Sequence, residues 1–129
     1  MAISRFKTWQ AYEFAFDLAS LIFEVSKRFP KNETYKLADQ IIRSSRSVCA
    51  NLAECYGRRA FKNHYHAKLT DCISENFETQ VWLAFALDCN YLGEEEYNDL
   101  LTTSEKVGKL LSYMQRNPAQ FISDRSKRG

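Results

Sequence analysis

Residues 41–59 read IIRSSRSVCANLAECYGRR, and apolar and polar side chains form two neighbouring stripes along this segment and the turn before it. The apolar stripe recurs at helical spacing and comprises Leu37, Ile41, Val48, Leu52 and Cys55. The polar stripe recurs at spacings of three and four and comprises Gln40, Ser44, Ser47, Asn51, Glu54 and Arg58. These periods predict a long helix whose apolar stripe is buried in a core and whose polar stripe lies next to that core.

The flanking segments have the same period and predict three more helices. Pro30 and Pro118 follow the first and the last of them, and proline stops a helix. We predict helices over residues 8–29, 33–57, 63–91 and 94–116, with Thr8 and Asn32 as caps of the first two. Short connectors make successive helices antiparallel, so the predicted fold is all-α: an up-down-up-down four-helix bundle over residues 1–117, followed by a polar, basic tail over residues 118–129.

The composition agrees with one helical domain. The chain has 129 residues, of which 45% are hydrophobic, but only 4 glycines and 2 prolines, too few turn formers for a many-stranded β fold. No apolar run is long enough to cross a bilayer and the first ten residues lack a signal peptide, so we expect a soluble, cytoplasmic protein without a membrane partner. The four cysteines stand singly and predict no disulfide framework, metal site or cofactor.

The first and third predicted helices carry more apolar surface than one bundle buries. In the first helix one row contains Trp9, Tyr12, Phe16, Ala19 and Phe23, and another contains Phe14, Leu18, Leu21, Ile22, Val25 and Phe29. In the third helix we expect the inward residues to be Leu69, Ile73, Phe77, Ala84 and Leu87, with Trp82 and Phe85 widening the apolar surface. This surplus predicts that the chain associates with copies of itself.

A basic cluster follows the end of the second helix. In YGRRAFKNHYHAK, residues 56–68, four cations interleave with aromatic side chains. Cations contact phosphates and rings stack on unpaired bases, so this segment predicts a nucleic-acid surface. The candidate residues are Arg58, Arg59, Lys62 and Lys68, assisted in the tail by Arg125, Lys127 and Arg128. Under the structural alternative, Phe61 and Tyr65 seal the end of the bundle.

The polar stripe has a structural interpretation and a catalytic one. In the first, its small polar groups hydrogen-bond between helices, and arginines such as Arg43 pair with Glu75 and Glu78 of the third helix. A catalytic site needs a nucleophile, a base and an electrophile that converge, and Ser, Cys, His64, His66 and Glu54 stand in no recognised arrangement. We therefore assign seven residues to structure or subunit contact, Gln40, Arg43, Ser44, Ser47, Asn51, Glu54 and Glu75, and predict that the protein is not an enzyme.

Three segments carry a recognisable pattern: QIIRSSRSVCANLAECYGRR at residues 40–59, the FP at residues 29–30, and SENFETQVWLAFALDCNYL at residues 74–92. Together they resemble the bacterial 23S rRNA-intervening sequence proteins, a family also called four helix bundle proteins. The resemblance spans residues 6–114 and matches at Gln40, Arg43, Ser44, Ser47, Asn51, Ala53, Glu54, Arg58 and Glu75. One position departs from the family pattern, because Cys55 stands where the family has Gly, and this puts the local close packing in question.

The resemblance implies a homopentameric, barrel-like ring without known enzymatic activity. The chain is also similar to the accessory variability determinant proteins of diversity-generating retroelements, which implies an adaptor that binds nucleic acid and a reverse transcriptase. We therefore expect a non-enzymatic oligomeric adaptor whose partners are further copies of the chain, RNA or DNA, and a reverse transcriptase. The alternative is a protein–protein interaction scaffold with no nucleic-acid role.

Overall fold

The computed structural model of the chain describes residues 5–122, and residues 1–4 and 123–129 lie outside that description. The described residues form four long helices and no strand. The helices are α1 (Gln10–Ser26), α2 (Leu37–Gly57), α3 (Lys62–Asp88) and α4 (Glu94–Arg116), and three short 3₁₀ helices accompany them, η1 (Arg5–Thr8), η2 (Lys31–Glu33) and η3 (Pro118–Gln120). The prediction of an all-α chain with four helices is confirmed. None of the described helices is both long enough and apolar enough to span a bilayer.

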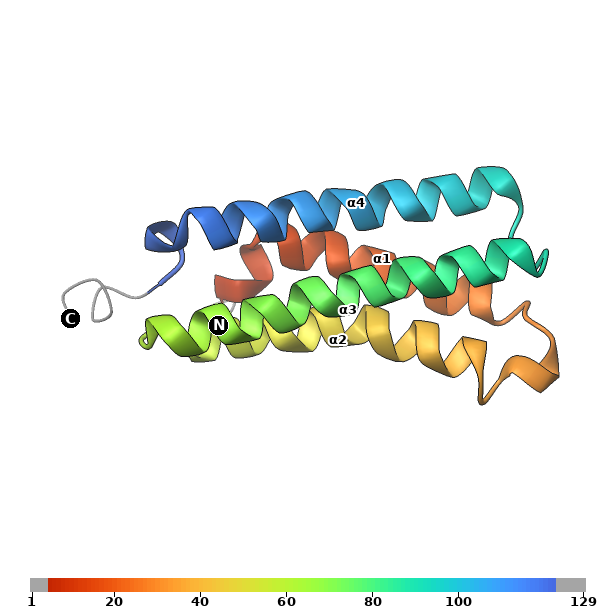
Figure 1. The fold of residues 1–129 in the computed structure, drawn as a ribbon, viewed down its shortest axis with the longest axis horizontal. Coiled ribbons are helices and arrows are strands. Elements are labelled where there is room, and N and C mark those ends of the chain that lie inside the picture. Colours follow the sequence, from red (N-terminus) through yellow and green to blue (C-terminus); the bar gives the residue numbers. More distant parts are fainter. Residues whose placement is uncertain (1–4, 123–129) are drawn as a thin grey trace.

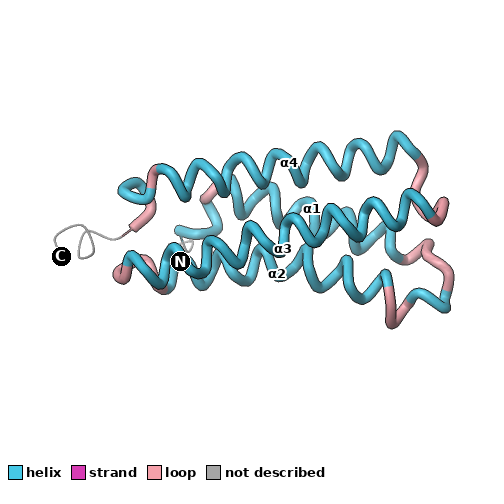
Figure 2. The backbone as a smooth tube through the Cα atoms, in the orientation of Figure 1, coloured by secondary structure: helices cyan, strands magenta, loops and turns pink. Residues whose placement is uncertain are grey.

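The four helices lie side by side along one axis (Figures 1 and 2). Both α2 and α4 pack against α1 and against α3, so α1 and α3 occupy diagonal corners of the bundle. The start of α1, the connection from α2 to α3 and the end of α4 gather at one end, on the left of Figure 1. The start of α4 and the end of α3 lie at the other end.

Two apolar clusters fill the bundle. One contains Ala11, Ala15, Val48, Leu52, Cys55, Tyr65, Leu69, Cys72, Val107, Leu111 and Met114. The other contains Leu18, Ile22, Phe29, Leu37, Ala38, Ile41, Leu83, Ala86, Leu92 and Leu100. Every residue of the apolar stripe predicted for α2 is buried in one of these clusters, so that prediction is confirmed.

A layer of polar side chains separates the two clusters. Thr79 Oγ1 and Ser44 Oγ are hydrogen-bonded at 2.8 Å. Asn76 donates to the Ser104 carbonyl at 3.0 Å and accepts from the Ser104 hydroxyl, also at 3.0 Å. All four side chains are at most 2% exposed. Because each of these buried groups has a partner on another helix, the layer fixes the register of α3 against α2 and α4.

The inward register predicted for α3 is wrong at two positions. Phe77 and Ala84 are exposed, whereas Asn76, Thr79 and Leu83 face the core. The prediction placed the apolar row inside because an unpaired polar group is costly to bury. The polar layer removes that cost by supplying hydrogen-bond partners across the core, and it leaves large apolar side chains of α3 in solvent.

The helices α1 and α2 are shorter than predicted. α1 begins at Gln10 rather than at residue 8, because residues 5–8 form η1, and it ends at Ser26 rather than at residue 29. α2 begins at Leu37 rather than at residue 33, because η2 precedes it. The predicted caps Thr8 and Asn32 therefore lie in 3₁₀ turns and not at the start of an α-helix.

The end of α3 depends on a left-handed residue. Asn90 has a φ of 62°. The Tyr91 N–H donates to the Ala86 carbonyl at 2.9 Å and the Asn90 N–H donates to the Leu87 carbonyl at 2.9 Å. This pair of bonds is a Schellman motif, which satisfies the last carbonyls of a helix. α3 therefore ends before Asn90 and short of residue 91. α2, by contrast, ends at Gly57 without a left-handed residue, because none of the described glycines has a positive φ.

Candidate nucleic-acid interface

Three segments meet at one end of the bundle: η1 with the start of α1, the α2–α3 connection, and the end of α4 with η3 (Figure 1). The Trp9 ring lies 5.8 Å from the Tyr56 ring and 5.6 Å from the Phe121 ring, measured between centroids. The Tyr65 hydroxyl donates to the Met114 carbonyl at 3.3 Å. These contacts hold the side chains of all three segments on one surface.

This end of the bundle is poor in carboxylates. Residues 6–12, 55–67 and 112–122 contain no Asp or Glu, and the nearest acids along the chain are Glu13 in the first turn of α1 and Glu54, which pairs with Lys68. The same stretches contain five cations, which we call the basic end: Lys7, Arg58, Arg59, Lys62 and Arg116. By contrast, the first turn of α4 at the opposite end holds three glutamates. The two ends of the molecule therefore differ in charge.

The cations of the basic end are open to an anion. Four of them are exposed and Arg59 is half-buried. The Arg59 guanidinium lies 3.7 Å from the Tyr56 ring centroid and donates to the Tyr56 carbonyl at 2.8 Å. Within residues 5–122 none of the five forms a salt bridge with a carboxylate. Neighbouring cations that repel one another and lack an acid attract phosphate.

The turn between α2 and α3 positions the centre of the basic end. α2 ends at Gly57 and α3 begins at Lys62, so only residues 58–61 connect them. Within the turn, the Phe61 N–H donates to the Arg58 carbonyl at 2.9 Å. A connection this short keeps the arginines at the end of α2 next to the lysine at the start of α3.

The aromatic residues of this turn divide between two roles. Tyr65 is fully buried and seals the bundle end, as the structural alternative predicted. Phe61 is 54% exposed, and its ring centroid lies 5.6 Å from that of His64. An exposed ring beside cations can stack on an unpaired base. The structure thus assigns one of the two aromatics to the core and leaves the other at the surface.

Lys68, a predicted phosphate contact, bridges α2 and α3. Its ammonium lies 3.0 Å from the Glu54 carboxylate and 3.7 Å from the Asp71 carboxylate. The hydrogen bond with Glu54 raises the pKa of Lys68. A cation that already has two acidic partners gains less from a phosphate, so we leave Lys68 out of the basic end.

Sequence reasoning missed Lys7 and Arg116 as members of the basic end. They lie far along the chain from the α2–α3 connection and join it only because the helices fold back on one another. The absence of acids from all three stretches is the one signal that could have linked them. The predicted tail cations Arg125, Lys127 and Arg128 lie outside the described residues.

The structure brings together five of the seven residues that were assigned to structure or subunit contact. They line a groove of about 500 Å³ between α2 and α3, and they are Gln40, Arg43, Ser44, Ser47 and Glu75. Of the other two, Asn51 donates to the Ser47 carbonyl at 3.0 Å on its own helix, and Glu54 holds Lys68. The polar stripe therefore forms hydrogen bonds within α2 as well as contacts between helices.

The electrostatics of this groove differ from the prediction. Arg43 pairs with Asp39 at 3.7 Å, one turn away on α2, and not with Glu75. Burial raises the pKa of Glu75, the neighbouring carboxylates of Glu78 and Asp71 raise it further, and Arg43 opposes them. Glu75 and Glu78 thus form no salt bridge within the described part of the chain, whereas Asp71 pairs with Lys68.

Two of the four thiols, those of Cys49 and Cys72, are poor nucleophiles because their pKa values are raised. Burial raises the pKa of Cys49 to about 11, and the hydrogen bond with Cys55 together with burial raises the pKa of Cys72. Cys55, which stands where the family resemblance has Gly, is fully buried and its thiol donates to the Tyr65 carbonyl at 3.7 Å. Its side chain therefore fits the core. Residues 5–122 hold no group of three or more His, Cys, Asp or Glu side chains that could bind a metal ion.

Comparisons with known proteins agree with the fold and give a family. The sequence profile of the 23S rRNA-intervening sequence protein family matches residues 7–113. A crystal structure of a protein of unknown function, from the S23 ribosomal protein family of Bacteroides thetaiotaomicron, is similar with a TM-score of 0.75. It is 23% identical, and the match covers 82% of this chain and 95% of that chain. None of the curated proteins matches this sequence.

Proposed function

We propose, from the premise that the chain belongs to the 23S rRNA-intervening sequence protein family, that it is a non-enzymatic adaptor that binds RNA or DNA through its basic end. The observation that carries the proposal is the convergence of five cations, none of them in a salt bridge within residues 5–122, from three segments of the chain. Phosphate backbones bind such a surface because the contacts release condensed counterions. The exposed ring of Phe61 supplies a stacking platform for an unpaired base.

The adaptor acts as a homo-oligomer of antiparallel, up-down-up-down bundles, and the family resemblance implies five copies. Apolar side chains left in solvent by the single chain support self-association. They are Phe16 and Phe23 on α1, and Phe77, Val81 and Phe85 on α3. Large apolar side chains grouped on a surface mark a protein–protein contact. An oligomer would also repeat the basic end and so strengthen weak phosphate contacts.

A reverse transcriptase is the proposed protein partner, on the likeness to the accessory variability determinant proteins. We expect the assembled oligomer to retain such an enzyme in a pull-down with purified components. The enzyme should also be retained after nuclease treatment, since a contact that runs only through shared nucleic acid would then be lost. Retention only before nuclease treatment would reduce the proposal to nucleic-acid binding.

A salt titration tests the nucleic-acid proposal. Fluorescence anisotropy with a labelled single-stranded RNA or DNA of mixed sequence measures the affinity at several salt concentrations. We expect binding at low salt and a linear fall of log K with log salt, with a slope of about −0.7 per phosphate contact on a single strand. The double variant Arg58→Ala, Lys62→Ala should bind more weakly and show a shallower slope, because it loses phosphate contacts.

A matched variant separates a site from net charge. Lys31→Ala, Lys36→Ala removes two exposed cations at the opposite end of the bundle and changes the net charge by the same amount. We expect it to bind as the wild type does. Equal losses in both double variants would refute the basic end as the site. No binding by the wild type at low salt would favour the alternative, a protein–protein interaction scaffold.

A further inference from the structure

Two unlike apolar surfaces lie on the diagonal helices α1 and α3. The first, the α1 groove, lies between α1 and α2, has a volume of about 480 Å³ and is lined among others by Phe16, Ala19, Phe23 and Arg46. The second, the α3 ridge, is a row of three side chains one turn apart that are 61%, 50% and 52% exposed: Phe77, Val81 and Phe85. Because their helices occupy opposite corners, the two surfaces face different directions.

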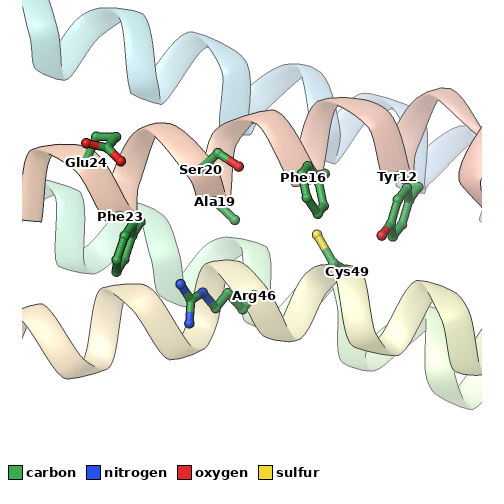
Figure 3. Close-up of a pocket in the computed structure, with 8 residues that line it drawn as sticks. All are labelled: Tyr12, Phe16, Ala19, Ser20, Phe23, Glu24, Arg46 and Cys49. Carbon is green, nitrogen blue, oxygen red and sulfur yellow. The ribbon is translucent and has the colours of Figure 1, made fainter.

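The α1 groove has the shape of a notch between two rings. Phe16 and Phe23 point from α1 along the side of α2, and Ala19 lies between them with its small side chain (Figure 3). Ala19 is buried, so it forms a floor rather than a rim. Arg46 rises from α2 on the other side of the groove. A row of bulky apolar side chains from another helix would fill the space above Ala19.

The charges beside the two surfaces are complementary. The Arg46 guanidinium lies 5.0 Å from the Phe23 ring centroid and forms no salt bridge with a carboxylate in the described part of the chain. On the other surface, residues 69–88 of α3 contain four acids and no Lys or Arg. Glu78, next to Phe77, accepts a hydrogen bond from Trp82 Nε1 at 3.2 Å and has no cationic partner among residues 5–122. A cation at the groove can therefore meet an acid at the ridge.

Pairing of like surfaces is unfavourable by comparison. Two α1 grooves face to face would leave both notches empty, which loses packing contacts; each lining holds one acid, Glu24, and one cation, Arg46, so packing rather than charge disfavours this pairing. Two α3 ridges face to face would oppose two convex rows of side chains and bring together the four acids of residues 69–88, while Lys36 lines a pocket with Phe85 and Lys109 lines one with Phe77. Groove against ridge joins a hollow to a row of knobs and opposite charges to each other.

We infer that the α3 ridge of one copy of this chain docks in the α1 groove of the next copy. The contact is heterologous, so each copy uses both surfaces and successive copies follow one another until the rotation closes a ring. This inference rests on the proposed function in one respect, the self-association, and adds the two faces that meet. The basic end takes no part in the contact, because its segments lie at the end of the bundle.

A mixing experiment tests the inference with two variants of the full chain. Phe23→Asp disables the groove and Val81→Asp disables the ridge, and light scattering after size exclusion measures the mass of each. Alone, each variant should be a monomer. Mixed in equal amounts, they should form a heterodimer and nothing larger, because the ridge of the Phe23→Asp chain fits the intact groove of the Val81→Asp chain. The remaining two surfaces of that dimer are both disabled.

Leu21→Asp is the matched control. Leu21 is an exposed apolar residue of the same helix, but it does not line the α1 groove. We expect this variant to keep the wild-type mass. Circular dichroism establishes that each variant is helical, and Phe23→Ser and Val81→Ser take the place of a variant that does not fold.

Several outcomes would overturn the inference. A wild-type oligomer whose mass is unchanged by both disabling variants would show that other faces meet, while the proposed adaptor would stand. A variant that dimerises alone would show a contact between like surfaces, and variants that stay monomeric when mixed would show that the groove and the ridge do not meet. A monomeric wild type at high concentration would remove the self-association itself, and the salt titration would then decide the nucleic-acid proposal independently.

Discussion

Asn76 makes two hydrogen bonds across the core to Ser104, so its removal tests whether the polar layer stabilises the bundle. We predict that Asn76→Ala lowers the free energy of unfolding by about 1–3 kcal/mol, because buried polar groups of Ser104 lose their partner. Urea denaturation followed by circular dichroism measures the change. Asn51→Ala is the control, since Asn51 is half-buried and bonds within its own helix. Equal losses in the two variants would show that the layer adds nothing to stability.

At the scale of single residues, the sequence predicted the positions of side chains that are set by the period of one helix. It did not predict the positions that are set by contacts with a second helix. The apolar stripe of α2 follows from helical spacing alone, and it is buried as expected. The inward position of Asn76 and the pairing of Lys68 with Glu54 depend on partners from other elements. Such partners cannot be read from the period of one segment, because they are set by how the helices are brought together.

At the scale of the elements, the end of α3 gives a prediction about backbone conformation. Asn90 has a φ of 62°, which costs most side chains about 1 kcal/mol and costs glycine little. We therefore expect Asn90→Ala to lower the melting temperature and Asn90→Gly to leave it unchanged or raise it. Both variants lose the same polar side chain, so each controls for the other in thermal denaturation. A similar decrease in both would show that the side chain, and not the φ angle, matters at this position.

The existence of the four helices was predictable and their ends were not. Each helix has a long periodic pattern, and a pattern over several turns tolerates single exceptions. The ends depend on a few residues and on local alternatives such as η1 and η2, which use the same residue types as an α-helix. The Schellman motif at Asn90 is one such alternative, because Gly57 and Gly93 offered more obvious left-handed residues in the sequence.

At the scale of the whole molecule, assembly and nucleic-acid binding should be coupled. Phe23→Asp leaves every cation of the basic end in place, yet a monomer presents one such surface where an oligomer presents several. We predict that this variant binds the labelled strand more weakly than the wild type by a factor on the order of 10², because multivalency is lost. Anisotropy at one fixed salt concentration measures the difference, with Leu21→Asp as control. Equal affinities would show that a single basic end is sufficient.

The candidate site was predictable only in the part that is continuous in the sequence. Arg58, Arg59 and Lys62 lie within five residues of one another and were chosen from the sequence. Lys7 and Arg116 belong to the same surface because α1 starts and α4 ends beside the α2–α3 turn. Lys68 was chosen because it lies close to these residues in the sequence, but on α3 its ammonium forms a salt bridge with Glu54 of α2. The outline of a surface built from several segments requires the fold.

The uneven charge of the two bundle ends has a kinetic consequence. A rod-shaped molecule with the five cations of the basic end at one tip and three glutamates in the first turn of α4 at the other carries a permanent dipole along its length. The electric field of a nucleic acid orients this dipole during the approach, so that the protein reaches the nucleic acid with its basic end first. A larger fraction of collisions is then productive, which raises the association rate constant. This increase becomes smaller as added salt screens the field.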